Sequence, residues 1–372
     1  MAVSIVTTTI NKPVLLRDYC KSARAYGHTD VSFIVIGDQK TPGDVGLFCD
    51  RLTREYGCDV LYFDVDKQLD YLRKFPELAH HLPFNSIQRR NIGLLVAYEM
   101  GAEVIVSIDD DNLVTESDFV GRHAAVGSRG ERECVASDSG WFNVCEMLVE
   151  EEGRPFYHRG FPMAQRWKKN TITTRRHQTR VVVNAGLWLN DPDIDAITRM
   201  DMPVRALALK PEYSDGVVLD MGTWCPFNSQ NTALAREVVP AYFLSPYIGR
   251  YDDIWASYFL RRIIDHLGDA VQYGPPLVHQ ARNDHNLWTD LDKEHEGMEL
   301  TDRLVDLLRD TTLTTRSYGE CFGELIERTT EAVETNGVFK LSEKEYLLKA
   351  LKGMRIWSGV FHRIQDGERP GR

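Results

Sequence analysis

Residues 104–112 read Val-Ile-Val-Ser-Ile-Asp-Asp-Asp-Asn, an apolar run that ends in the three carboxylates Asp109, Asp110 and Asp111. Its composition predicts a buried strand, and open α/β sheets bind their ligands at the carboxyl ends of such strands. Three adjacent acids repel one another unless a cation or a hydrogen-bond network neutralises them. A hydrated Mg²⁺ or Mn²⁺ ion carrying a diphosphate would do this, because these hard cations bind carboxylate and phosphate oxygens together. The alternative is an acidic turn in which Asp111 or Asn112 caps the next helix.

The residues on the N-terminal side of this run alternate between strand and helix patterns. Strands are predicted at 3–9, 31–36, 60–63 and 104–108, and helices at 13–26, 48–56 and 85–100. This order predicts an α/β fold with a mostly parallel, twisted sheet flanked by helices. No Gly-x-Gly-x-x-Gly string follows the first strand and no Walker-type loop occurs, so the usual dinucleotide and P-loop motifs are missing.

The composition is that of an ordinary globular protein, with 372 residues of which 43% are hydrophobic and 27% charged. A formal net charge of −11 argues against a general nucleic-acid-binding or anionic-membrane surface. No apolar run approaches the ~20 residues needed to span a bilayer, and the first residues lead into a strand rather than a signal peptide. Seven cysteines without a Cys-x-x-Cys pair indicate reduced thiols. We therefore expect a cytoplasmic protein with neither a nucleic-acid partner nor a membrane span.

The C-terminal part of the sequence has a helical pattern. Leucines recur at helical spacing from about residue 300, and again between 341 and 356. We predict a catalytic, ligand-binding domain over residues 1–298, a helical appendage over 299–364 and a disordered tail over 365–372. Because the appendage is of a packing or assembly type, we also expect self-association into a homo-oligomer.

Basic residues gather between positions 166 and 180, although the chain is acidic overall. They are Arg166, Lys168, Lys169, Arg175, Arg176 and Arg180. A charge run is most often a solvated loop, which is how we interpret this segment. The alternative is a mobile lid over phosphate groups.

Two further segments carry side chains that could contact a ligand. Arg90 opens the helix before the acidic strand and could bind a base or a phosphate bidentately, or it is a surface residue of the first helical turn. Farther along, Gly249 permits a tight turn, and Asp252 and Asp253 follow it directly. One of these carboxylates could act as a general base or bind sugar hydroxyls, or it could cap the helix that begins there.

His279 follows a strand-like apolar stretch at 273–278. A single histidine at a strand end is more often structural than a ligand. It becomes a metal-ligand candidate only if it completes a shell begun by Asp109 and Asp111.

Several longer strings in one order make the sequence similar to a known family. They are Ser107-Ile108-Asp109-Asp110-Asp111, then Trp141-Phe142-Asn143, then Arg159-Gly160-Phe161-Pro162, then Gly186-Leu187-Trp188-Leu189-Asn190-Asp191-Pro192-Asp193-Ile194-Asp195-Ala196, then Pro226 with Asn231, Ala233, Arg236 and Glu237, then Ile248-Gly249-Arg250-Tyr251-Asp252-Asp253-Ile254-Trp255-Ala256, and finally His279. Over about residues 85–295 the chain resembles the reversibly glycosylated polypeptides, which include the UDP-arabinopyranose mutases.

The resemblance implies a GT-A-type glycosyltransferase fold for residues 1–298 and a nucleotide-diphosphate sugar, specifically a UDP-sugar, as ligand. It implies Mn²⁺ or Mg²⁺ held by Asp109 and Asp111, with His279 as third ligand and Asp110 at the ribose or sugar. It also places Asp252 and Asp253 near the sugar and the acceptor. The candidates for binding the nucleotide sugar are Thr7, Asp38, Arg90, Asp109, Asp110, Asn231 and Arg250.

One departure from the family concerns the arginine that becomes glycosylated in its members. Counting forward from Arg159-Gly160-Phe161-Pro162 leads to Arg166, whereas counting back from Gly186-Leu187-Trp188 leads to Arg176. The two counts disagree because the segment between these strings is about ten residues longer here than the resemblance implies. Both arginines are therefore catalytic candidates, and the divergence weakens the expectation of mutase or self-glycosylating chemistry.

Three functions are compatible with these residues. The first is a metal-dependent glycosyltransferase that cleaves the sugar–UDP bond and passes the sugar to an unknown acceptor. The second is a pyranose–furanose mutase, with reversible self-glycosylation, that returns the sugar to UDP in another ring form. The third is a catalytically silent subunit that binds nucleotide sugar. The clustered carboxylates argue against this third function, since a silent protein does not need them.

Overall fold

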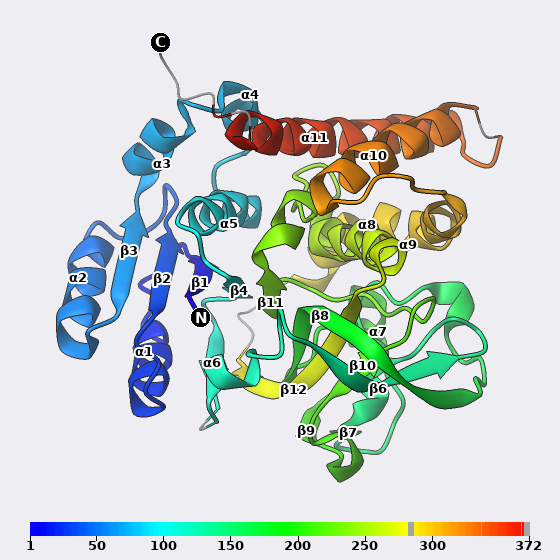
Figure 1. Cartoon of the computed structure of the whole chain (residues 1–372), viewed down its shortest axis with the longest axis horizontal. Coiled ribbons are helices and arrows are strands. Elements are labelled where there is room, and N and C mark those ends of the chain that lie inside the picture. The colour runs from blue at the N-terminus through cyan, green and yellow to red at the C-terminus, as the bar shows by residue number, and fades with distance from the viewer. Residues whose placement is uncertain (116, 282–285, 336, 366, 368–372) are drawn as a thin grey trace.

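The apolar run at 104–108 forms β4 (Val104–Ile108), an inner strand of a large sheet in the computed structural model (Figure 1). The structure describes residues 1–115, 117–281, 286–335, 337–365 and 367. β4 pairs in parallel with β1 (Val3–Thr8) and antiparallel with β11 (Asn231–Ala235), and all of its side chains are buried. Since both faces of the strand are covered, the run shows no polar alternation. The strand ends at Ile108, before the first aspartate, because charged groups do not continue into a core without partners.

The N-terminal half of the sheet is parallel, as predicted, in the order β3 (Asp59–Phe63), β2 (Val31–Ile36), β1 and β4. The flanking helices α1 (Leu16–Ala25), α2 (Val45–Tyr56) and α5 (Arg90–Glu99) are also present, with ends within a few residues of those predicted. Gly93 allows α5 to lie close to the sheet, since a Cβ atom there would be 2.4 Å from Cγ1 of Val6. The α/β class is therefore confirmed.

Beyond β4 the sheet is mixed and is organised by β8 (Ile172–Asn190), a strand of 19 residues. β8 pairs antiparallel with β11 and with β6 (Arg129–Ser137), and in parallel with β12 (Ala270–Gln280). The loop that we predicted for residues 166–180 is therefore wrong from Ile172 onward, because this segment pairs with β6 along its whole length. Isoleucine and threonine at 171–174 favour a strand, but we gave more weight to the basic residues on both sides, which are typical of a solvated loop.

The other elements are short and complete the layers around the sheet. The strands are β5 (Asn112–Val114), β7 (Leu148–Glu150), β9 (Ala206–Leu209) and β10 (Val217–Leu219); the helices are α3 (Val65–Leu72), α4 (Pro76–His81), α6 (Phe119–Arg122) and α7 (Ala196–Asp201); the 3₁₀ turns are η1 (Ile87–Arg89), η2 (Val144–Met147), η3 (Met163–Gln165), η4 (Pro211–Tyr213), η5 (Arg236–Ala241) and η6 (Gly249–Tyr251). All seven cysteines are buried and free, as expected for reduced thiols.

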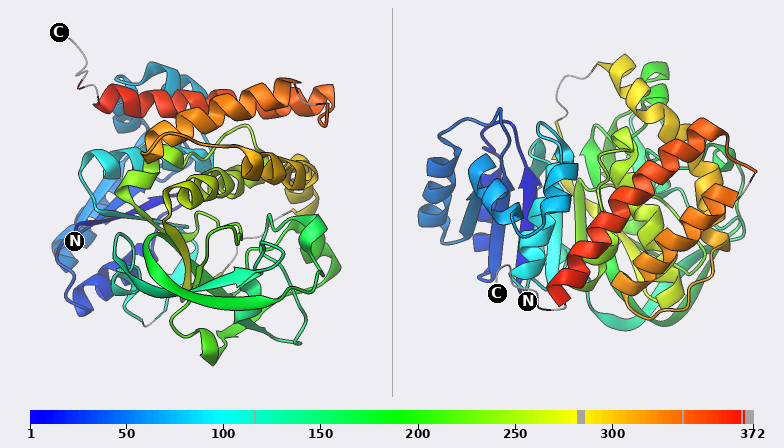
Figure 2. Two further views of the ribbon diagram at one scale, coloured as in Figure 1. Left: turned by 45° about the vertical axis from the view of Figure 1, so that its right-hand side comes forward. Right: turned by 90° about the horizontal axis from the view of Figure 1, so that it is seen from above.

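The predicted C-terminal helices are present, and they cross the molecule above the sheet (Figures 1 and 2). After α8 (Asp252–Leu267) come α9 (Leu287–Asp310), α10 (Tyr318–Thr335) and α11 (Leu341–Gln365). The domain boundary that we placed after residue 298 falls inside α9, and the tail predicted for 365–372 lies outside the described residues except for 365 and 367. Among the described helices, none is both long and apolar enough to cross a membrane.

Candidate active site

A cleft of about 730 Å³ opens where the carboxyl ends of β1, β2 and β4 meet the N-terminal end of α8. Its described lining includes residues 8–11, 36–38, 85–90, 109–111, 191–193, 228–230, 246, 249–250 and 252–253, together with Arg159, Arg199, Gln280 and Lys293. The cleft thus combines segments that lie between residues 8 and 293 of the chain. It lies at the edge of the sheet at which α/β folds bind their ligands.

The acidic triplet lines this cleft, and each of its members has a hydrogen-bond donor from a different element. Asp109 accepts from Nη2 of Arg90 at 2.6 Å, Asp110 from Oγ1 of Thr9 at 2.5 Å, and Asp111 from Nε2 of Gln280 at 3.2 Å. Burial and the neighbouring carboxylates raise the pKa of Asp110, and they raise the pKa of Asp111 to about 7. The three negative charges are therefore only partly compensated within the protein.

The donor set of the triplet fits a hard divalent cation. Magnesium commonly binds through one or two carboxylates, with water and substrate phosphates completing its shell, so a closed protein cage is not required. The described residues contain no group of three or more histidine, cysteine or acidic side chains that could by themselves hold a metal ion. An open site that needs phosphate oxygens is the kind that these aspartates could form.

His279 is not brought to the cleft. His279 lies on β12, where it pairs with Leu113 on β5 and Leu189 on β8, and it is exposed. It is not among the described residues that line the cleft. Its neighbour Gln280 does line the cleft and donates to Asp111. Because side chains alternate between the two faces of a strand, the histidine beside Gln280 points the other way.

Asp252 and Asp253 line the cleft at the start of α8. The turn before them needs Gly249, whose φ is +61° and where a Cβ atom would lie 2.2 Å from the carbonyl oxygen of Lys293. The N-cap residue of α8 is Tyr251, so neither aspartate caps the helix in the way that the alternative interpretation proposed. Both residues line the cleft.

The two aspartates lie in different electrostatic surroundings. Asp252 accepts from Nε2 of Gln88 at 2.7 Å, and burial together with the adjacent Asp253 raises the pKa of Asp252 to about 7. Asp253 instead accepts from Arg159 at 3.2 Å and from the backbone amide of Ser229 at 3.0 Å. A pair of carboxylates in such contrasting environments is typical of sites that use one as a proton donor or acceptor.

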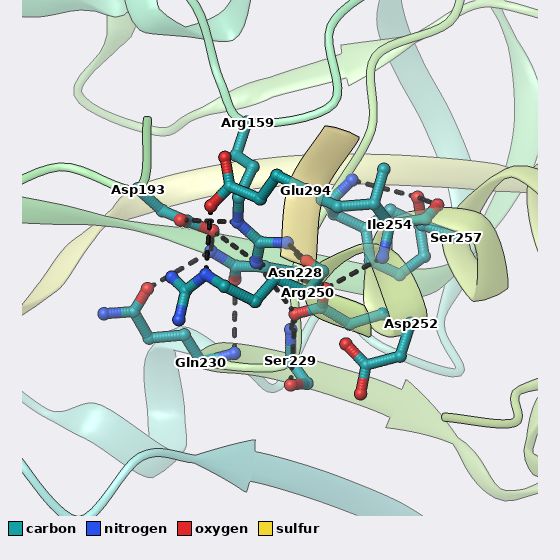
Figure 3. A network of polar contacts seen from close by, with 12 residues as sticks. Arg159, Asp193, Asn228, Ser229, Gln230, Arg250, Asp252, Ile254, Ser257 and Glu294 are labelled. Carbon is teal, nitrogen blue, oxygen red and sulfur yellow. Dashed lines mark hydrogen bonds and ion pairs between the residues drawn. The ribbon is translucent and has the colours of Figure 1, made fainter. Parts of the chain in front are cut away.

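Arg159 is the buried centre of the polar network in Figure 3. Its guanidinium donates bidentately to Asp193, at 2.8 and 2.9 Å, and also to Asp253 and to the carbonyl oxygen of Arg250. Burial alone would raise the pKa of Asp193, but the positive charge and hydrogen bonds of Arg159 hold it well below its usual value. Asn228 adds a further donor to Asp193 at 2.7 Å.

Sequence reasoning did not select Arg159 or Asp193 as site residues, although both lie within the strings that carry the family resemblance. The feature of the sequence that could have indicated the importance of Arg159 is the glycine that follows it. Gly160 has a φ of +82°, and a Cβ atom there would lie 2.2 Å from Cγ2 of Ile254. Only glycine permits this approach of the loop to α8. The same approach allows Arg159 to reach Asp253.

The end of the cleft near β2 has a second buried network. Asp38 accepts from the backbone amide of Ser86 at 3.1 Å. Beside it, Nε of the buried Arg89 donates to Gln68 at 2.7 Å, and Gln68 in turn donates to the carbonyl oxygen of Gly37 at 2.7 Å. Arg89 and Gln68 therefore fix the backbone that carries Asp38, and Ile87 adds an exposed apolar surface to the same end.

The remaining predicted site residues divide between the cleft and other places. Arg250 lines the cleft and donates to Glu294 of α9 at 3.0 Å. Thr7 is buried beneath the lining, and the buried Asn231 donates to the carbonyl oxygen of Leu187 at 3.0 Å. Arg166 is paired with the buried Asp195 at 2.6 Å, and Arg176 is an exposed residue of β8. The described residues that line the cleft therefore do not include Thr7, Asn231, Arg166 or Arg176.

Comparisons with known proteins agree with the resemblance inferred from the sequence. The family model described as reversibly glycosylated polypeptide matches residues 62–363. UDP-arabinopyranose mutase 3 of Arabidopsis thaliana is 30% identical over 300 residues, covering 78% of this chain and 75% of that protein. A probable UDP-arabinopyranose mutase 2 of Solanum tuberosum is 32% identical over 266 residues, covering 69% of this chain and 68% of its own length.

Solved structures give more distant matches. TarS 1–349 of S. aureus aligns with a TM-score of 0.37 at 10% identity, covering 100% of this chain and 93% of that one. The mannosyltransferase PcManGT of Pyrobaculum calidifontis, in complex with GDP-Man and Mn²⁺, aligns with a TM-score of 0.41 at 9% identity, covering 95% and 86%. The sequence matches are therefore the informative ones, and the residues matched by the family model include the acidic triplet, Arg159 and the Asp252–Asp253 pair.

Proposed function

Since the chain belongs to the reversibly glycosylated polypeptide family, we propose that it is an enzyme that breaks and re-forms the bond between a sugar and UDP, converting a pyranose ring into a furanose ring. The observation that carries this proposal is that two clusters of aspartates line one cleft, the triplet Asp109–Asp111 and the pair Asp252–Asp253. Relatives named as UDP-arabinopyranose mutases support this proposal, whereas the sequence alone favoured transfer to a separate acceptor.

In this proposal the nucleotide lies between the two ends of the cleft. Asp38 and the apolar side chain of Ile87 supply a polar and an apolar contact suited to a base, while the triplet faces the diphosphate. Asp109 and Asp111 would hold Mn²⁺ or Mg²⁺. Such a bound cation would stabilise the negative charge that develops on the departing phosphate.

The Asp252–Asp253 pair suits the proton transfers of ring contraction. When the bond from C1 to the phosphate oxygen breaks, its electron pair leaves with the phosphate. The 4-hydroxyl oxygen then attacks C1 and releases its proton, and the ring oxygen departs from C1 with its electron pair and takes up a proton. Return of the phosphate oxygen to C1 gives the furanose isomer, with no net change in protons. Asp252, with a pKa of about 7, can accept the first proton and deliver the second.

Replacing Asp252 with asparagine tests this role through its pH dependence. We expect Asp252→Asn to lower kcat by roughly 100-fold, the scale of one lost proton-transfer group. Because the folded-state pKa is raised from 3.8 to about 7, the wild-type protein loses stability from this group as pH rises towards 7. The variant lacks that loss, so it should be more stable than the wild type at pH 8, by on the order of 2–4 kcal/mol, and similar to it at pH 4.

The measurement is urea-induced unfolding of both proteins at pH 4, 6 and 8, together with kcat over the same range. Asparagine keeps an oxygen that can accept from Gln88, so the hydrogen bond at 2.7 Å need not be lost. A variant that is less stable than the wild type at every pH would contradict the assignment of a raised pKa to Asp252.

The proposed function itself is tested by incubating the purified protein with Mn²⁺ and a panel of UDP-sugars, including UDP-arabinopyranose, without an acceptor. We expect a new isomer of unchanged mass, resolved by chromatography with mass detection. Slow release of free UDP without an isomer would contradict the mutase and favour the transferase, the second candidate. The second candidate is favoured by the exposed basic residues between Arg159 and Gly186, in a segment that the family resemblance implies is lengthened and that could shape an additional binding surface. No change in any UDP-sugar would favour a silent, nucleotide-sugar-binding subunit.

A further inference from the structure

The basic residues at 168–180 are not used by the proposed chemistry, although they are the strongest concentration of positive charge in the sequence. No aspartate or glutamate occurs between Glu152 and Asp191, in a chain that has 55 acidic residues in total. Residues 172–180 of β8 pair with β6, which on its other edge pairs with β10. We call residues 172–180 together with β6 the basic ribbon. The partner strand β6 carries Glu131 and Glu133, so the excess of positive charge belongs to the β8 side of the ribbon.

The basic ribbon has one open edge. Within the described part of the chain, β6 is the strand that pairs with residues 172–180, whereas β12 pairs with β8 from residue 181 onward. Residues 172–178 are all exposed, so neither face of this part of β8 is covered. Their backbone groups on the open edge can therefore accept another strand, over about seven residues or roughly 23 Å.

The side chains around this edge are cationic and accessible. Arg175 and Arg176 each have 71% of their side chains exposed, and Lys168 and Lys169 precede them on the surface. The acidic neighbours compensate only weakly, since Arg175 lies 3.8 Å from Asp220 and Arg176 lies 3.5 Å from Glu133. Ile172, the first residue of β8, is an exposed apolar residue, as is Trp167 five positions before it.

These observations identify the kind of partner. Antiparallel pairing of two such edges would bring Arg175 and Arg176 of one copy against the same residues of the other, and like charges directly opposite each other are destabilising. An extended segment with acidic side chains would instead complement the edge, gaining both backbone hydrogen bonds and charge pairing. We propose that the open edge of the basic ribbon docks an extended acidic segment of another polypeptide by β-strand addition.

The position of the basic ribbon makes this surface separate from the cleft. In the view from above, β6 runs along the lower edge of the molecule, while α7 and the N-terminal end of α9, which carry cleft residues, lie at the upper edge (Figure 2). None of residues 168–180 occurs in the described lining of the cleft. Docking therefore does not depend on the proposed function, and either can fail without the other.

The test uses a fluorescein-labelled peptide, Gly-(Glu-Val)₄-Glu-Gly, and fluorescence anisotropy with the full-length protein. We expect saturable binding that weakens as NaCl is raised from 50 to 300 mM, because the charge pairs are solvent-exposed. The double variant Lys169→Glu with Arg175→Glu should weaken binding at least tenfold. The matched control Arg51→Glu with Arg73→Glu reverses the same charge on exposed residues of the N-terminal half and should change affinity less than twofold.

A second peptide separates strand addition from simple charge attraction. Replacing the second of its four valines with proline keeps every charge but removes a backbone donor and resists extended pairing, so we expect at least tenfold weaker binding. Equal binding of the two peptides would overturn strand addition, as would equal weakening by the control variant. A dimer that sedimentation velocity detects in the wild type and that the double variant abolishes would show that the edge binds a second copy instead. UDP affinity serves as the check that both variants are folded.

Discussion

Replacing Asp109 or Asp111 with alanine should lower turnover of the preferred UDP-sugar by about 1,000-fold or more, because the protein would lose the carboxylates proposed to hold the divalent cation. The same variants should lose the gain in UDP affinity that Mn²⁺ produces. Calorimetric titration of UDP, with Mn²⁺ and with a chelator, measures this gain directly. In the wild type we expect a clear difference between the two conditions, and in both variants similar, weak binding in each.

Stability separates this expectation from simple misfolding. Burial and the neighbouring acids raise the pKa of Asp111 to about 7, so above that pH its charge opposes folding when no cation is bound. Asp111→Ala should therefore be at least as stable as the metal-free wild type at pH 8. Asp66→Ala, at an exposed acid on α3, is the matched control and should leave turnover unchanged. Turnover that survives both triplet substitutions, or equal wild-type UDP affinity with and without chelator, would remove the metal from the mechanism.

The N-terminal half of the fold could be predicted because its information is local. β2 and β4 have the bounds predicted for them, since each is a short apolar run with polar residues at both ends. β8 could not be predicted in the same way. Its first half is exposed on both faces and its second half is buried, so the strand as a whole has neither the alternating nor the continuous pattern. Only pairing with β6, β11 and β12 defines it.

The same contrast holds for the site. The acidic triplet is contiguous in the sequence and lies in the cleft. The buried network around Arg159, in contrast, joins this arginine to Asp193 and Asp253, which lie 34 and 94 positions further along the chain. No local pattern reveals such a cluster, although the resemblance placed Arg159, Asp193 and Asp253 within separate strings of one family. His279 and Gln280 differ by one position on a strand, and that difference decides which side chain faces Asp111.

We expect the largest loss of stability from substituting Arg159, the centre of the buried polar network. Arg159→Met would leave the buried carboxylates of Asp193 and Asp253 without their shared cation, and breaking a buried ion pair from one side typically costs about 3–5 kcal/mol. We expect a loss of that size in the free energy of unfolding at pH 7, measured by urea denaturation. Arg176→Met is the matched control, because its ion pair with Glu133 is exposed at both ends, and it should cost less than about 1 kcal/mol.

The pH dependence of this loss identifies its cause. In the wild type Arg159 keeps the pKa of Asp193 well below its usual value, so the pair stabilises the fold above the unfolded-state pKa of aspartate, near 3.8, and this contribution fades as pH falls. In Arg159→Met the carboxylates can be protonated at low pH, which relieves their unpaired burial. The difference between variant and wild type should therefore be greatest near pH 7 and should shrink towards pH 4. A difference that stays constant over this range would mean that Arg159 stabilises the fold by packing rather than by charge, and that Asp253 is held in the cleft by Ser229 instead.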